Sequence, residues 1–206
     1  RSSDLGVAFT LTWLFGTNNE QIKNENKPSK NKTEKAEQPA QAMETKAENA
    51  DVADDGIITA PLSGKAVKLE NVPDQTFAQG ILGLGAAIEP TEGKVVAPGD
   101  GKVETLFDTF HAVGLTLDNG KELLIHVGIN TVELKGEGFK AYVSEGDRVT
   151  KGQTLITFDM DFIKSKGYQT ITPVLVGNSD EFASVEELAE EGTEVTIGDR
   201  LIKVNA

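Results

Sequence analysis

Residues 115–129 read LTLDNGKELLIHVGI, and this stretch predicts a β-hairpin. Asn119-Gly120 stands between two runs of alternating apolar and polar residues, which is the strongest short-range signal for a two-residue type I′ turn. Such a turn pairs Asp118 with Lys121, and this pair sets the register of both strands.

In that register the two histidines of the chain share one face of the hairpin. Val113 lies opposite His126, and His111 lies opposite Gly128. Diagonal neighbours on one face are roughly 7–8 Å apart, so the two imidazoles are expected to converge on one small group. Leu124 is expected on the same face, as part of an apolar surround.

The histidine pair limits the chemistry that the chain can perform. A catalytic zinc takes three protein ligands, and no HxH or HExxH spacing supplies a third, so no metal is expected. A neutral imidazole, with a pKa of about 6.5, is a nitrogen nucleophile at neutral pH, and a second imidazole can donate a hydrogen bond to a transferred phosphoryl group. Two interpretations remain: satisfied polar residues in a hairpin, or a phosphohistidine site.

Alternation and turn signals recur along residues 57–206, which predicts an all-β sandwich or barrel-like domain. The segment 60–65 (APLSGK) is similar to 97–102 (APGDGK), and 145–156 is similar to 191–202. The domain is therefore expected to contain duplicated β units.

Two short helical segments are also expected. Residues 161–166 predict one or two helical turns. Residues 184–190 (SVEELAE) have a helical pattern in which Ser184 is the N-cap and Glu187 completes a capping box.

The composition excludes several classes of partner and chemistry. The 206 residues contain 20 Lys and Arg against 33 Asp and Glu, which gives a formal net charge of −13 at pH 7. Such a chain repels phosphate backbones, so we expect no nucleic-acid binding and no affinity for anionic membrane surfaces. The chain has no Cys, which excludes disulfides, thiolate nucleophiles and zinc–thiolate sites.

The first 56 residues differ from the rest. Leu5–Gly16 is an apolar run, but a membrane-spanning helix needs about 20 apolar residues. We expect residues 1–16 to be the end of a truncated membrane segment. Residues 17–56 are mostly polar and charged, which is typical of a flexible linker.

Several motifs then carry a resemblance to a known family. They are 60–64 (APLSG), 72–78 (VPDQTFA), 96–101 (VAPGDG) and, most specifically, 124–139 (LIHVGINTVELKGEGF). With these motifs, residues 57–206 resemble the glucose-type enzyme IIA domain of the bacterial phosphoenolpyruvate:sugar phosphotransferase system.

The resemblance implies roles for individual residues. His126 matches the residue that the family phosphorylates, His111 the second active-site histidine, and Thr109 a threonine that hydrogen-bonds within the site. It also implies an apolar docking surface around the histidines. The expected partner-binding residues are Phe77, Ile81, Leu82, Val113, Leu124, Val127, Gly128 and Asn130, while Phe107 and Val132 belong either to this surface or to the β core. Asn130 stands where many members have Asp, which removes a negative charge near the site.

The resemblance implies a phosphoryl carrier that accepts its group from the phosphocarrier protein HPr on His126 and passes it to a cysteine of a IIB domain, without a cofactor. Because such domains are often fused to a IIC-type membrane domain, we expect tethering through residues 1–16 to the cytoplasmic face of the cell membrane. The sugar itself stays open.

The sequence leaves two alternatives to this carrier. One is a regulatory IIA-like domain of a sugar symporter. The other is a lipoyl- or biotinyl-like carrier domain, because residues 143–159 have its hairpin pattern. The 159–161 segment (DMD), however, lacks the lysine that such a carrier modifies.

Overall fold

The computed structural model describes residues 55–206. The expected membrane segment, residues 1–16, and nearly all of the expected linker, residues 17–56, lie outside the described residues. Within the described part of the chain, no helix is long and apolar enough to cross a membrane.

The described residues form mostly short strands. The strands are β1 (Ile57–Thr59), β2 (Gly64–Lys68), β3 (Leu84–Pro90), β4 (Lys94–Val96), β5 (Gly101–Leu106), β6 (Ala112–Leu117), β7 (Glu122–His126), β8 (Phe139–Ala141), β9 (Arg148–Val149), β10 (Thr154–Phe158), β11 (Thr172–Val176), β12 (Ser184–Glu187), β13 (Glu194–Val195) and β14 (Arg200–Asn205). The helices are α1 (Gln75–Ala78) and α2 (Met160–Ser165), and the 3₁₀ turns are η1 (Leu69–Asn71), η2 (Thr131–Leu134) and η3 (Ser179–Glu181).

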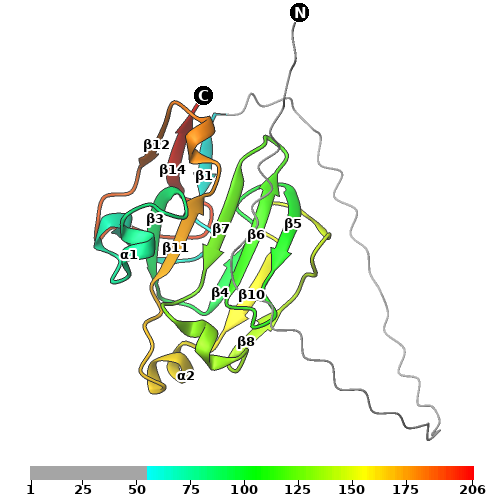
Figure 1. Cartoon of the computed structure of the whole chain (residues 1–206), viewed down its shortest axis with the longest axis vertical. Helices are drawn as coiled ribbons and strands as arrows, with labels where there is room; N and C mark the ends of the chain where they lie inside the picture. Colours follow the sequence, from blue (N-terminus) through cyan, green and yellow to red (C-terminus); the bar gives the residue numbers. More distant parts are fainter. Residues whose placement is uncertain (1–54) are drawn as a thin grey trace, which may run out of the picture. The chain divides into compact units, whose positions relative to one another are not determined.

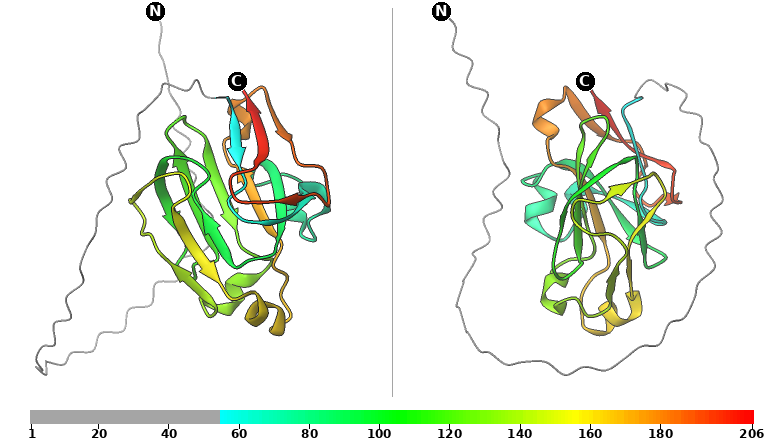
Figure 2. Two further views of the ribbon diagram at one scale, coloured as in Figure 1. Left: turned by 180° about the vertical axis from the view of Figure 1, so that it is seen from behind. Right: turned by 90° about the vertical axis from the view of Figure 1, so that its right-hand side faces the viewer.

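Three antiparallel sheets contain these strands. The large sheet has eight strands in the order β13-β2-β3-β11-β7-β6-β5-β9, and the two small sheets have the orders β1-β14-β12 and β4-β10-β8. Figure 1 shows the β4-β10-β8 sheet behind the lower part of β6 and β5, and the β1-β14-β12 sheet at the upper left. The views from behind and from the side show the small sheets packed on one face of the large sheet (Figure 2). The predicted all-β class is confirmed.

The fold consists of two related halves, as the repeated motifs predicted. Ala66 of β2 exchanges two backbone hydrogen bonds with residues 192–193, and Val103 of β5 exchanges the equivalent two with residues 146–147. Related strands follow one another in the same order from either edge of the large sheet. The two halves meet at its centre, where β11 pairs with β7.

The large sheet buries apolar side chains on both faces. On the inner face, residues such as Val113 and Ile125 pack against the small sheets in the main core. On the outer face lies a second group, which we call the outer cluster, covered in part by the β2–β3 connection (residues 69–83). The outer cluster comprises Leu69, Val72, Phe77, Ala87, Ala112, Leu124, Ile129, Ile171 and Leu175.

The predicted hairpin of β6 and β7 is present, but its predicted register is wrong by one residue. The Leu117 N–H donates to the Lys121 carbonyl, which leaves a three-residue loop with Gly120 at φ 83°. A left-handed glycine closes such loops. Asp118 does not pair with Lys121, because its N–H donates to the Asp100 carbonyl and its carboxylate binds a neighbouring arginine.

A shift of one residue moves side chains to the opposite face of a sheet. Ala112, and not Val113, lies opposite His126. Val113 is 0% exposed and belongs to the main core, so its predicted place beside the histidines is wrong.

One predicted helix is confirmed and the other is wrong. The turns expected at 161–166 correspond to α2, whose N-cap Asp159 accepts from the Phe162 N–H. Residues 184–190 begin instead with strand β12, which pairs with β14. Its Ser184 hydroxyl donates to Glu186 and caps no helix. Pairing with β14 outweighed the local helical pattern.

Candidate active site

His111 and His126 lie beside each other on the outer side of the large sheet. Their ring centroids are 4.8 Å apart, and the ring planes meet at 79°. His126 ends β7, whereas His111 immediately precedes β6 and accepts a hydrogen bond on its carbonyl from Val127 N–H. If side chains alternated regularly along the strand, His111 would point to the inner face together with Val113. Phe110, which has φ 55°, interrupts this alternation. His111 therefore lies on the outer side, where its imidazole meets that of His126.

A hydrogen bond within its own loop fixes the ring of His126. Its Nδ1 lies 2.8 Å from the carbonyl oxygen of Gly128. A carbonyl oxygen only accepts, so Nδ1 carries the hydrogen, and Nε2 of the neutral ring holds a free lone pair. The predicted register placed Gly128 opposite His111, and this placement is wrong. Gly128 instead supplies the carbonyl that accepts from His126 Nδ1.

The loop after His126 requires glycine at position 128. Gly128 has φ 74°, and a Cβ atom there would lie 2.5 Å from Thr131 Cγ2 and 2.6 Å from the Gln169 carbonyl oxygen. Asn130 is also left-handed, at φ 59°, a conformation that Asn tolerates better than most residues. Ile129 anchors the loop by donating its N–H to the Gln169 carbonyl at 3.1 Å.

Thr109 orients the second histidine. Its Oγ1 lies 2.5 Å from His111 Nδ1. When the hydroxyl donates this hydrogen bond, the hydrogen of the neutral His111 ring is on Nε2. The ring of Phe107 packs against His111 with a centroid distance of 5.3 Å.

Both histidines are neutral at neutral pH. His111 is only 5% exposed, and burial together with the nearby His126 lowers its pKa from 6.5 to about 4. Burial also lowers the pKa of His126, although the hydrogen bond to Gly128 and the charge of Asp74 oppose that shift. The site therefore presents neutral nitrogen ligands and nucleophiles.

Apolar side chains form the floor around the two rings. The ring of Phe77 lies 5.0 Å from that of His126, and Phe77 and Leu124 are buried members of the outer cluster. Leu82 and Phe107 are partly buried and pack against the same cluster. This floor limits the access of water to the rings.

The other residues predicted to bind partners differ in exposure. Ile81 is 66% exposed and Val132 is 45% exposed, and Asn130 also lies at the surface. Val113 and Val127 are each 0% exposed in the main core, so their predicted place in a docking surface is wrong.

The sequence reasoning did not assign a site role to Asp74 or to Thr131. The Asp74 carboxylate accepts from Thr76 N–H as the N-cap of α1, and its charge acts on His126. An aspartate directly before a short helix is a recognisable signal for such a cap. Thr131 is 0% exposed and donates its hydroxyl to the Val127 carbonyl at 2.5 Å, which no sequence pattern signals.

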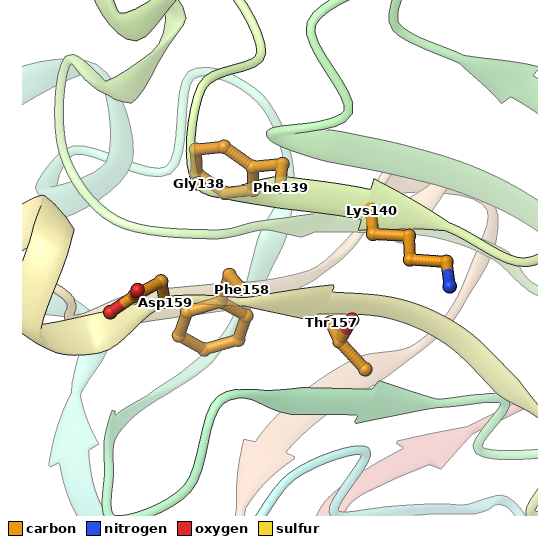
Figure 3. Close-up of a pocket in the computed structure, with 6 residues that line it drawn as sticks. All are labelled: Gly138, Phe139, Lys140, Thr157, Phe158 and Asp159. Carbon is orange, nitrogen blue, oxygen red and sulfur yellow. The ribbon is translucent and has the colours of Figure 1, made fainter.

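A separate hollow lies between β8 and β10. Figure 3 shows Phe139 on β8 and Phe158 on the neighbouring β10, with Lys140 and Thr157 towards one end and Asp159 towards the other. The hollow belongs to a small sheet and does not contact the histidines. Within residues 55–206, no group of three or more His, Asp or Glu side chains is placed to hold a metal ion.

These features define an all-β domain with a histidine pair on the outer side of its large sheet, and known proteins are similar to it in sequence and fold. The solved glucose permease IIA from Mycoplasma capricolum is 32% identical, with a TM-score of 0.63 over 71% of this chain and 93% of that one. The glucose-specific EIIA component of Halalkalibacterium halodurans is 50% identical over 137 residues, which is 66% of this chain and 79% of that protein. The corresponding Staphylococcus aureus protein is 47% identical over 135 residues, 66% of this chain and 81% of its own.

The family model for the phosphoenolpyruvate-dependent sugar phosphotransferase system, EIIA 1, matches residues 56–182. The chain belongs to this family. Membership leaves no support for the alternative of a lipoyl- or biotinyl-like carrier domain.

Replacing Gly128 by Ala is expected to lower the free energy of unfolding by roughly 1–3 kcal/mol through backbone strain, with a further loss from the close contacts. Gly120→Ala is the matched control, because Gly120 has φ 83° but no atom within 4 Å of its missing Cβ. Denaturant unfolding of both variants measures the difference. Equal losses would show that the packing of the loop around Gly128 is unimportant.

The depressed histidine pKa values predict a pH dependence of stability. Between pH 6.5 and about 4 the unfolded chain binds a proton at His111 that the folded domain does not, so stability is complete above pH 6.5 and falls as the pH decreases. The shift corresponds to roughly 3 kcal/mol at most. Unfolding measured from pH 7.5 to 4 should show this slope, and it should be smaller in His111→Gln. An identical slope in that variant would contradict the assignment.

Proposed function

We propose that this domain carries a phosphoryl group on Nε2 of His126, accepts it from phospho-HPr and donates it to a cysteine of a IIB domain. The observation that carries the proposal is the Nδ1 hydrogen bond to Gly128, which leaves Nε2 as the free nucleophile beside His111. Membership of the EIIA family and the names of the glucose-specific relatives support the same role.

Acceptance needs no proton transfer at His126. The Nε2 lone pair attacks phosphorus, and the P–N bond of the donor breaks with its electron pair returning to the donor imidazole. The phosphorylated ring keeps its Nδ1 hydrogen and gains positive character, which the Gly128 carbonyl stabilises as acceptor at 2.8 Å. Donation reverses the chemistry: a cysteine thiolate attacks phosphorus, and the electron pair of the P–N bond returns to Nε2.

His111 is suited to assist rather than to attack. Its Nδ1 is engaged by Thr109, so a hydrogen on Nε2 is available to a phosphoryl oxygen on the neighbouring ring. A charged histidine would be a stronger donor. It would also cost more to bury next to His126, and the pKa of about 4 keeps it neutral.

We propose that HPr and the IIB domain dock on the exposed apolar residues beside the histidines, Ile81 and Val132. Ile81 follows α1, whose Phe77 packs on His126, and Val132 follows the loop that carries Gly128. Both side chains are exposed, whereas most large apolar residues of residues 55–206 are buried. Buried apolar anchors usually carry most of the energy of a protein interface.

We also propose that the chain acts at the cytoplasmic face of the membrane, joined to a IIC-type domain through residues 1–16. The apolar run Leu5–Gly16 and the polar composition of residues 17–56 support this proposal. Recovery of the full-length protein in the supernatant after membrane sedimentation would contradict it, and failure to donate to any IIB domain would favour a regulatory domain of a symporter.

The central test is incubation of the domain with phosphoenolpyruvate, enzyme I and HPr. The intact mass is then measured at alkaline pH, where phosphohistidine survives. We expect one phosphoryl group on the wild-type domain and none on His126→Ala, because the nucleophile is lost. Undiminished labelling of His126→Ala would exclude His126 as the acceptor.

His111→Gln is the companion variant in the same assay. Acceptance from HPr should persist, because Nε2 of His126 is retained, while donation to IIB should slow about tenfold or more with the loss of one hydrogen-bond donor. Normal rates in both steps would show that His111 does not contact the phosphoryl group.

Replacing Ile81 by Ser is expected to weaken HPr binding about tenfold or more, because burial of an isoleucine side chain contributes roughly 1.5–3 kcal/mol. Tyr142→Ser is the matched control, since Tyr142 is 51% exposed on the segment after β8, away from the histidines. Calorimetric titration with HPr measures both. Equal affinities of the two variants would contradict the proposed docking surface.

A further inference from the structure

The orientation of the Gly128 carbonyl is fixed by a hydrogen bond at the other end of its peptide unit. The carbonyl of residue 128 and the N–H of Ile129 belong to the same planar peptide and point in opposite directions. The Ile129 N–H donates to the Gln169 carbonyl at 3.1 Å, and the Gly128 carbonyl accepts from His126 Nδ1 at 2.8 Å. The bond to Gln169 therefore fixes the plane in which the carbonyl points at the histidine.

The preceding peptide unit is held by a side chain. The Thr131 hydroxyl donates to the Val127 carbonyl at 2.5 Å, and Thr131 is 0% exposed. Gly128 is thus the only flexible joint between two fixed peptide planes. A side chain at this joint would be strained, because a Cβ there would lie 2.5 Å from Thr131 Cγ2.

This arrangement controls which nitrogen of His126 carries the hydrogen. A free imidazole in water favours the hydrogen on Nε2, the tautomer in which that nitrogen has no lone pair to offer. In the domain the Gly128 carbonyl faces Nδ1, and an acceptor there stabilises the tautomer with the hydrogen on Nδ1. A carbonyl that rotated away would release the ring to the unreactive tautomer.

We propose that Thr131 is a positioning residue for phosphoryl transfer, whose hydroxyl holds the 127–128 backbone so that the Gly128 carbonyl selects the tautomer of His126 with a nucleophilic Nε2. This role rests on the proposed function of His126. Thr131 itself does not touch the reacting atoms, and it acts through the backbone of its own loop.

The test uses the full chain labelled with 15N-histidine and compares Thr131→Val, which lacks the hydroxyl, with Thr131→Ser, which retains it. In the unphosphorylated wild type and in Thr131→Ser, Nδ1 of His126 should resonate as a protonated nitrogen and Nε2 as an unprotonated one. In Thr131→Val the two shifts should move towards each other. The rate of acceptance from phospho-HPr should fall about tenfold, the ratio that corresponds to the loss of one ordinary hydrogen bond.

Thr59→Val is the matched control for lost stability. Thr59 is also buried, and its hydroxyl donates to the Pro98 carbonyl at 2.9 Å, outside the outer cluster. It should destabilise the fold without changing the His126 resonances. If Thr131→Val does not fold, Thr131→Ala removes the same hydroxyl without the steric demand of a second methyl group and should show the same change.

Two outcomes separate this role from the function of the site. Unchanged tautomer shifts in folded Thr131→Val or Thr131→Ala would overturn the role of Thr131, even if wild-type His126 is phosphorylated. A wild-type domain that accepts no phosphoryl group would overturn the proposed function, whatever the tautomer shifts of the variants.

Discussion

The hydrogen bond from His126 Nδ1 to the Gly128 carbonyl is the interaction on which the site depends. It orients the ring, places the hydrogen on Nδ1 and leaves the lone pair on Nε2, in a ring whose centroid is 4.8 Å from that of His111. The bond exists because residue 128 takes a left-handed conformation that brings its carbonyl back to the preceding histidine. That conformation disfavours side chains, and a Cβ at position 128 would also clash with Thr131 and Gln169.

The related halves of the fold contribute unequally to this site. Ile125 pairs with Val174 where the halves meet, and the next residues are His126 in one half and Leu175 in the other. Leu175 is buried beneath the long β2–β3 connection, whereas the connection between β5 and β6 is short and leaves His126 partly exposed. The long connection also brings Phe77 against His126. One half therefore supplies both histidines, and the other adds Phe77 to the apolar side chains around them.

The sequence predicted the all-β class, the duplication and the convergence of the histidines, but not the geometry that produces the convergence. Asn119-Gly120 identified the hairpin, whereas the hydrogen bond of Asp118 to another loop, which shifts the register, depends on tertiary contacts. The left-handed Phe110, which restores the convergence, has no sequence signal. Because of the shifted register, Val113 was assigned to the wrong face. Residues 184–190 have a helical pattern, but the segment begins with a strand because residues 184–187 pair with β14.

The segments that build the site lie far apart along the chain, and this separation affects how the site forms during folding. Phe77, His126 and Gln169 come from distant parts of the sequence and meet only across the finished large sheet. Antiparallel sheets dominated by such long-range contacts fold slowly, because loop closure must precede the stabilising contacts. The histidine pair therefore exists only once these long-range contacts have formed. A chain that is still being synthesised, or one that has partly unfolded, lacks the converged histidines on which the proposed phosphoryl transfer depends.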